Sequence, residues 1–193
     1  MVILASGPSL ADSQLRAAKA ARAKGKCRVI AVNNTWERAP WADALYACDD
    51  NWWQHYQPAF KGERWTQSER AAEYGARRCP GRTGYVLSQN PAFIHFGGNS
   101  GFQAVNLAYH MGAARIVLAG FDMQVAQDGR QHWHDDHKGP CHNPGWRQIS
   151  KWAANFDRLA DQLIELGVEP VNASIETALR LWPRMDIGEA LDP

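Results

Sequence analysis

The stretch MVILASGPSL, residues 1–10, decides the fold expected for this chain. Its apolar run at residues 2–5 is typical of a buried strand, and residues 6–9 then form a glycine turn before a helix rich in Ala, Lys and Arg. Glycine lets a backbone come close to a ligand, and the free N–H groups of a helix start attract anions. The stretch therefore predicts a nucleotide or phosphate site at the edge of an α/β sheet, with a purely structural turn as the alternative.

Further apolar runs recur at a spacing that fits alternating strands and helices. Strands are predicted at residues 2–5, 28–32, 44–48, 85–87, 115–119 and 168–171. Helices are predicted at residues 13–24, 101–111, 144–166 and 175–181, with a long polar loop at residues 123–146. Short apolar strands joined by helices favour a mostly parallel sheet that is covered by helices on both faces, an α/β fold.

The length of 193 residues fits one domain, with no internal repeat or low-complexity linker. Residues 51–98 are mixed, aromatic and rich in turns, so we expect them to form short helices and loops that serve as a lid or an acceptor-side insertion.

Composition excludes several classes of protein. The net charge of +1 gives no bulk attraction to nucleic acid or membrane. No run approaches the roughly 18–20 apolar residues of a membrane span, and the apolar start is short and lacks the basic residues of a signal peptide. The four cysteines form no CxxC pair and are expected to be reduced, so a cytoplasmic protein is predicted.

Small and polar residues follow several of the predicted strands. In an open parallel sheet, ligands bind beyond the carboxyl ends of the strands, so these residues are expected to converge on one crevice. The predicted nucleotide-binding residues are Ser6, Gly7, Pro8, Ser9, Asn33, Asn34, Asp49, Asn99, Ser100 and Gly101. Asp49 or its neighbour Asp50 is expected, with Asn33, to contact the ribose or base.

The segment HWHDDH at residues 132–137 is the part of the chain richest in reactive side chains. It matches the HxHxDH metal signature of metallo-β-lactamase-type hydrolases, but such enzymes need further ligands downstream, and only His142 follows. Three alternatives remain open. The loop supplies a general base from His132 or His134, it holds a structural zinc ion, or its histidines only hydrogen-bond within the loop. The zinc ligands would come from His132, His134, His137, Cys141 and His142.

Nine tryptophans are many for this length, and most are expected in the core. Trp52, Trp53 and Trp133 lie in polar, loop-like sequence and are predicted to contact ligand. Among them, Trp133 and Trp52 are the expected acceptor-binding residues.

In the order of its motifs the chain resembles a Rossmann-like group of families. The group includes bacterial lipooligosaccharide sialyltransferases, motility-associated flagellin glycosyltransferases and archaeal hydroxymethylpterin diphosphokinase-like proteins. The matching segments are Gly7-Pro8-Ser9-Leu10, Asn33, Ser100-Gly101, Gly120-Phe121-Asp122, Asp128-Gly129-Arg130-Gln131-His132 and Asn172-Ala173-Ser174. The NSG, GFDMQ and HWH segments also resemble small proteins of tailed bacteriophages.

The resemblance implies a Rossmann-like fold and a glycosyltransferase of the sialyltransferase type. A CMP-sugar or nucleoside diphosphate sugar would be the donor, held by Gly7, Ser9, Asn33, Ser100 and Gly101. His132, which matches the D-G-x-x-H pattern, or His134 would be the general base. A phage origin would imply a glycan or modified DNA as acceptor and the host bacterial cytoplasm as location.

Carboxylates near the crevice are candidates to bind Mg²⁺, which would favour a diphospho donor or ATP. The predicted ligands are Asp122, Asp135 and Asp136, and Asp122 is also a predicted catalytic residue. Two alternative functions follow from the same crevice: a Mg²⁺-dependent pyrophosphokinase-like enzyme, and a non-catalytic nucleotide-binding accessory module of a phage.

Overall fold

The N-terminal apolar run forms β1 (Val2–Leu4), an inner strand of the main sheet in the computed structural model, which describes residues 1–192. The sheet has seven strands in the order β5-β4-β3-β2-β1-β8-β9, and every neighbouring pair is parallel. In β1, Ile3 lies beside Ile30 on one side and Leu118 on the other. A strand paired on both edges and covered on both faces has no position for a polar side chain, which explains its unbroken apolar sequence.

The sheet, the smaller strand pair and the helices are built from the following segments. The main sheet also contains β2 (Val29–Val32), β3 (Ala44–Tyr46), β4 (Glu63–Thr66), β5 (Arg77–Arg78), β8 (Arg115–Ala119) and β9 (Glu169–Asn172). A separate parallel pair consists of β6 (Gly81–Arg82) and β7 (Ile94–His95). The helices are α1 (Asp12–Ala23), α2 (Asp50–Tyr56), α3 (Ser100–His110), α4 (Trp146–Glu165) and α5 (Ile187–Leu191), with short 3-10 turns η1 (Asn33–Glu37) and η2 (Ala71–Tyr74).

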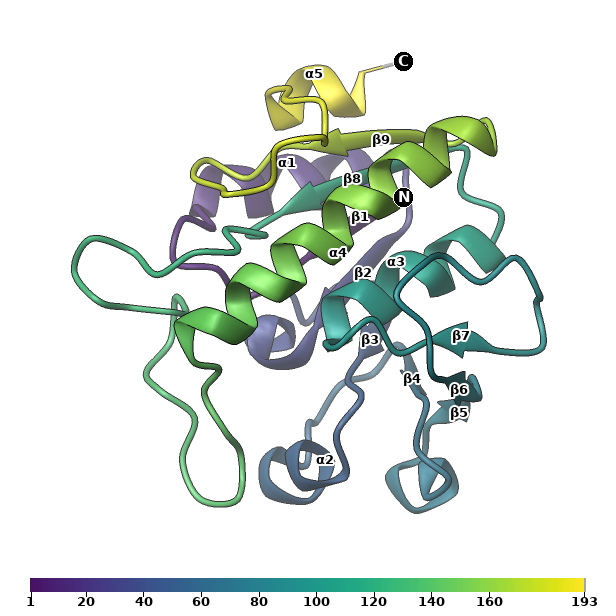
Figure 1. Ribbon diagram of the computed structural model, residues 1–193, viewed down its shortest axis with the longest axis vertical. Coiled ribbons are helices and arrows are strands. Elements are labelled where there is room, and N and C mark those ends of the chain that lie inside the picture. Colours follow the sequence, from purple (N-terminus) through teal and green to yellow (C-terminus); the bar gives the residue numbers. More distant parts are fainter. Residues whose placement is uncertain (193) are drawn as a thin grey trace.

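Helices cover both faces of the sheet (Figure 1). Because side chains alternate along a strand, Ile3 packs into the cluster that contains Phe102 of α3 and Phe156 of α4. Its neighbour Val2 packs into the opposite cluster with Leu15 of α1, and α5 lies on that face. The predicted α/β fold, a mostly parallel sheet between two helical layers, is confirmed and is Rossmann-like.

The strand order creates a switch point beside β1. The chain runs outward from β1 through β2, β3, β4 and β5, then returns to place β8 and β9 on the opposite side of β1. At such a point the connections leave in opposite directions and open a crevice beyond the carboxyl ends of the strands. This topology fixes where a ligand site is expected.

Two predicted elements are wrong. Residues 85–87 form no strand, since Tyr85 and Val86 are exposed, and the strands near them are β6 and β7. Residues 175–181 form no helix, because the segment is held irregularly against the chain that follows β8. There Thr177 Oγ1 donates to the Phe121 carbonyl (2.8 Å) and the Ala178 N–H donates to the Asp122 carbonyl (2.8 Å). The short final helix begins at Ile187 instead.

Residues 51–98 contribute more to the sheet than the sequence indicated. They supply β4 and β5, which extend the main sheet beyond β3. The sequence Glu-Arg-Trp-Thr of β4 is mostly half-buried and polar, so it carries no apolar signal. A lid role for this region stays a prediction.

Among residues 1–192, none of the helices has both the length and the apolar character that crossing a membrane requires.

Candidate functional site

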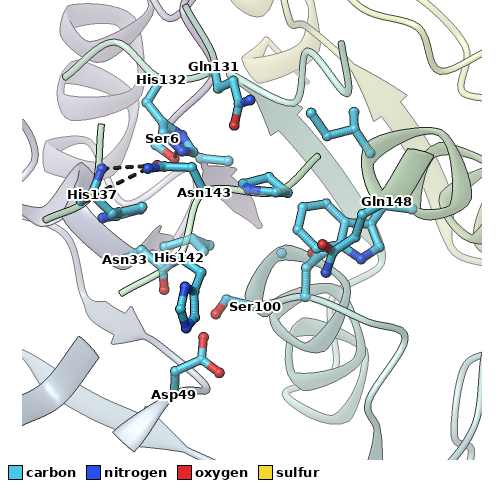
Figure 2. Close-up of a pocket in the computed structure, with 18 of the residues that line it drawn as sticks. Ser6, Asn33, Asp49, Ser100, Gln131, His132, His137, His142, Asn143 and Gln148 are labelled. Carbon is cyan, nitrogen blue, oxygen red and sulfur yellow. Dashed lines mark hydrogen bonds between the residues drawn. The ribbon is translucent and has the colours of Figure 1, made fainter. Parts of the chain in front are cut away.

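A cavity of about 370 Å³ opens at the carboxyl ends of β1, β2, β3 and β8, beside the switch point (Figure 2). The turn after β1, the start of α3, the loop at residues 123–145 and the first turns of α4 supply its walls. The predicted site residues that line it are Ser6, Gly7, Asn33, Asp49, Trp52, Asn99, Ser100, Gly101, Asp122 and His132. Segments separated by more than a hundred residues therefore meet at one site.

Other predicted residues lie outside the lining of this cavity: Pro8, Ser9, Asn34, Trp133, His134, Asp135 and Asp136. Asn34 is buried, and its Oδ1 accepts from the Trp52 indole N–H (2.7 Å). The indole of Trp133 packs against the cluster beneath α1 and lies 5.1 Å from the Arg38 guanidinium. Both contacts serve packing of the fold.

Trp52 and Trp53 do not lie in a loop, as the sequence suggested, but on α2, where their side chains are 3% and 2% exposed. The Trp53 indole N–H donates to the Ala47 carbonyl (3.1 Å), so this ring is part of the core. Trp52 reaches the cavity wall while its N–H is used by Asn34.

The glycine turn after β1 binds an anion, but that anion is the carboxylate of Asp122. The Ser9 N–H and hydroxyl donate to the two oxygens of Asp122 (both 2.8 Å). The Gly7 N–H donates to the Gly120 carbonyl (2.8 Å), and the Leu10 N–H donates to the Gly7 carbonyl (3.1 Å). The expectation that free N–H groups of this turn face a phosphate is therefore wrong at these three positions.

Asp122 is largely removed from water, and this burial raises the pKa of its carboxyl group against the opposing effect of the Ser9 hydrogen bonds. The three predicted magnesium ligands are not gathered at one point. Both oxygens of Asp122 are engaged by Ser9, while Asp135 and Asp136 are exposed and lie outside the cavity lining.

The start of α3 offers unpaired hydrogen-bond donors to the cavity. The Asn99 side chain caps the helix by accepting from the Phe102 N–H (2.9 Å), and the Gln103 N–H donates to the Asn99 carbonyl. The N–H groups of Ser100 and Gly101 find no acceptor within residues 1–192, as expected for the first residues of a helix. The Asn99 amide Nδ2 is also buried without a partner in this range. Together these donors form a site suited to an anion.

The Ser100 hydroxyl, by contrast, joins α3 to the end of β3. It accepts from the Cys48 N–H and donates to Cys48 Sγ, each at 3.1 Å. Burial raises the pKa of the Cys48 thiol well above its usual value, so this cysteine is a structural thiol.

Asn33 faces the cavity in a backbone conformation that few residues adopt. Its φ is 49°, and its buried Oδ1 has no hydrogen-bond partner in the described part of the chain. Met123, across the cavity after β8, has φ 50°. Asparagine tolerates the left-handed region better than most residues, and strained conformations of this kind cluster at ligand sites. Asn33 therefore presents an acceptor for a ligand N–H or O–H group.

His132, His134 and His137 form a compact cluster beside the cavity. Their ring centroids lie 4.8 to 5.0 Å apart. Burial, reinforced by the neighbouring histidines, lowers the pKa of His132 to about 3 and that of His137 to about 4, and burial lowers the pKa of His134. All three rings are therefore neutral at neutral pH.

The structure gives His132 little access to a substrate. Its Nδ1 forms a hydrogen bond with the Ser6 hydroxyl (3.2 Å), and its Nε2 is enclosed. A ring with this low pKa is also a weak base.

Several lining residues had no motif to indicate them: Asn51, Gly98, His142, Gln148 and Trp152. Figure 2 shows the imidazole of His142 projecting into the cavity, with the carboxylate of Asp49 pointing toward it and Ser100 nearby. In the sequence analysis His142 is only one of the alternative zinc ligands. Trp152 belongs to the stripe of apolar residues along α4. That stripe was the only feature of the sequence that indicated this residue.

Fold and site define a Rossmann-like α/β protein with a polar cavity at the switch point of its sheet. Comparisons with protein-family models, curated proteins and solved structures found no match for the chain.

Proposed function

We propose that the protein binds a nucleotide-activated donor in this cavity and transfers a group from it to an acceptor hydroxyl, as a glycosyltransferase of the sialyltransferase type. The observation that carries the proposal is the convergence of unpartnered polar groups on one cavity at the switch point. The N–H groups of Ser100 and Gly101, the side-chain amide Nδ2 of Asn99 and the side-chain Oδ1 of Asn33 all belong to its walls. A cavity of about 370 Å³ falls within the size range of small-ligand sites.

In this proposal the start of α3 binds the phosphate of the donor. Two backbone N–H groups and the positive end of the helix dipole face the anion there. Asn33 Oδ1 accepts a hydrogen bond from the ribose or base. This arrangement replaces the glycine turn, where the Ser9 and Gly7 N–H groups already donate to Asp122 and to the Gly120 carbonyl.

His142 is the proposed general base, oriented by the carboxylate of Asp49. The acceptor oxygen attacks the anomeric carbon, and its proton passes to His142. The bond from that carbon to the phosphate oxygen breaks, and its electron pair remains on the departing nucleotide. Positioned base catalysis of this kind contributes about 10²–10⁴-fold to the rate. The acceptor, whether a glycan or modified DNA, would enter past the loop at residues 123–145.

A thermal-shift screen against CMP, CDP, UDP, GDP, ATP and NAD, each with and without Mg²⁺, tests the proposal. A nucleotide at 100 times its Kd is expected to stabilise the fold by about 2.7 kcal/mol. That corresponds to a rise in Tm of about 5–10 °C for a domain of this size. Stabilisation by CMP without metal supports a CMP-sugar donor.

The other outcomes of the screen count against parts of the proposal. Stabilisation by ATP only with Mg²⁺ would favour a pyrophosphokinase-like enzyme. Binding of a nucleotide whose activated donor is neither hydrolysed nor transferred would favour a non-catalytic accessory module. No shift with any nucleotide would contradict the proposal as a whole.

A further inference from the structure

The cluster of His132, His134 and His137 has a geometry that the proposed function does not use. One ligand-capable atom from each ring lies within 4.8 Å of those of the other two. The three residues lie within a six-residue segment, residues 132–137, of the loop at residues 123–145. No other group of three or more His, Cys, Asp or Glu in residues 1–192 is gathered in this way.

Each ring is held through Nδ1 by a different oxygen. Nδ1 of His132 is bonded to the Ser6 hydroxyl (3.2 Å), and Nδ1 of His137 is bonded to the Tyr56 hydroxyl (2.7 Å). Nδ1 of His134 donates to the Asp135 carbonyl (2.6 Å), which fixes the tautomer and leaves a lone pair on Nε2. Histidines that bind metals through one nitrogen are typically held in this manner through the other.

The opposite nitrogens lack partners. The Nε2 atoms of His132 and His134 are buried and unbonded within the described residues. A buried polar atom without a partner costs free energy, so it calls for a ligand or a water molecule.

We propose that His132, His134 and His137 bind one divalent transition-metal ion of the Zn²⁺ class through their Nε2 atoms. Three imidazoles suit Zn²⁺, whereas Mg²⁺ and Ca²⁺ prefer oxygen ligands. At Zn–N distances of 2.0–2.1 Å, tetrahedral ligands lie about 3.3 Å apart. Metal binding therefore requires the three rings to move inward, and the rings of His132 and His134, whose planes are now stacked within 6°, to tilt toward the ion. Three protein ligands leave a fourth position for water.

The ion would fasten three parts of the molecule together. Through His132 it would tie the loop to the turn after β1, and through His137 to α2 at Tyr56. The Asn143 amide already closes the loop by bonding the N–H of His137 (3.0 Å) and its carbonyl (3.3 Å), as the dashed lines in Figure 2 show. The same loop carries His142 into the cavity. The inference is independent of the proposed function, because the site stands on the three histidines alone.

Metal binding by the whole chain tests the proposal directly. Protein freed of metal with EDTA is titrated with Zn²⁺ in competition with a chromogenic chelator, and with Co²⁺ while the visible spectrum is recorded. We expect one ion per chain, intense four-coordinate Co²⁺ bands and a rise in Tm with Zn²⁺. His134→Gln is expected to weaken Zn²⁺ binding about 100-fold or more. The matched control is His55→Gln, since His55 is exposed on α2 outside the cluster, and it should bind as the wild type does.

Three results would overturn the proposal: no Zn²⁺ bound by the wild-type chain, equal affinity in His134→Gln, or an equally large loss in His142→Gln. If His134→Gln does not fold, histidine-selective NMR of the wild-type chain decides. Addition of Zn²⁺ should shift the Nε2 resonances of three histidines while their Nδ1 atoms keep the proton. Unchanged resonances would contradict the site.

Discussion

Replacing His142 with alanine is expected to lower turnover of the nucleotide donor by about 10²–10⁴-fold while nucleotide affinity changes little. The imidazole projects into the cavity, with the carboxylate of Asp49 pointing toward it, whereas the proposed phosphate and nucleoside contacts belong to α3 and Asn33. Loss of the ring therefore removes proton transfer and leaves donor binding intact. The measurement is steady-state release of nucleotide from the donor identified by the thermal-shift screen, together with its Kd.

His55→Ala is the matched control, because this exposed histidine on α2 does not line the cavity. Turnover by the His55→Ala variant should equal that of the wild type. His132→Ala separates the two histidine assignments. This variant is expected to have a lower free energy of unfolding and weaker metal binding, while the rate of the proton-transfer step changes little. Wild-type turnover in His142→Ala, combined with complete loss in His132→Ala, would show that the general base is His132.

Replacing Gly7 with alanine is expected to lower the free energy of unfolding by about 3 kcal/mol, with a fall in Tm of about 6–12 °C. A methyl group at this position would lie 2.5 Å from the Gly120 carbonyl oxygen and closer still to Oδ1 of Asp122. The backbone of β8 cannot move away, because β8 is paired on both sides. The contact of Ser9 with Asp122 would be lost with the turn. Thermal and urea unfolding measure the effect.

Gly145→Ala is the control for this substitution. No heavy atom lies within 4 Å of the position of its new methyl group, and its φ of −73° suits alanine. As the N-cap of α4 it should cost less than about 1 kcal/mol. A Gly7→Ala variant as stable as Gly145→Ala would show that the close approach of Asp122 to the turn is wrong.

The strands that the sequence revealed are those in the middle of the sheet. Residues 2–5 and 115–119 are predicted because both faces of β1 and β8 are buried, so every position is apolar except Arg115 at the start of β8. In β4, Glu63 and Arg64 are only half-buried, and β5 contains just Arg77 and Arg78, both exposed. Near the edge of a sheet the apolar pattern that marks a strand weakens, so hydrophobic periodicity does not predict β4 and β5.

The candidate site was only partly predictable. Positions such as Asn33 and Asp49 follow from the rule that ligands bind at the carboxyl ends of parallel strands. The contact between the glycine turn and Asp122 could not be predicted, because Ser9 and Asp122 lie 113 residues apart and no local sequence pattern indicates their contact. His142 was equally hidden, since the direction of a side chain in a long loop depends on the closed fold.

The affinity of the best nucleotide for Asn33→Gly tests most directly that the cavity is the nucleotide site. Glycine adopts the φ of 49° without strain, so the substitution removes the amide while keeping the backbone. Gln57→Gly is the matched control, because Gln57 has φ 40° at the exposed end of α2, outside the cavity. By isothermal titration we expect Asn33→Gly to bind about tenfold more weakly and Gln57→Gly to bind as the wild type does. Equal affinity in all three proteins would contradict the account.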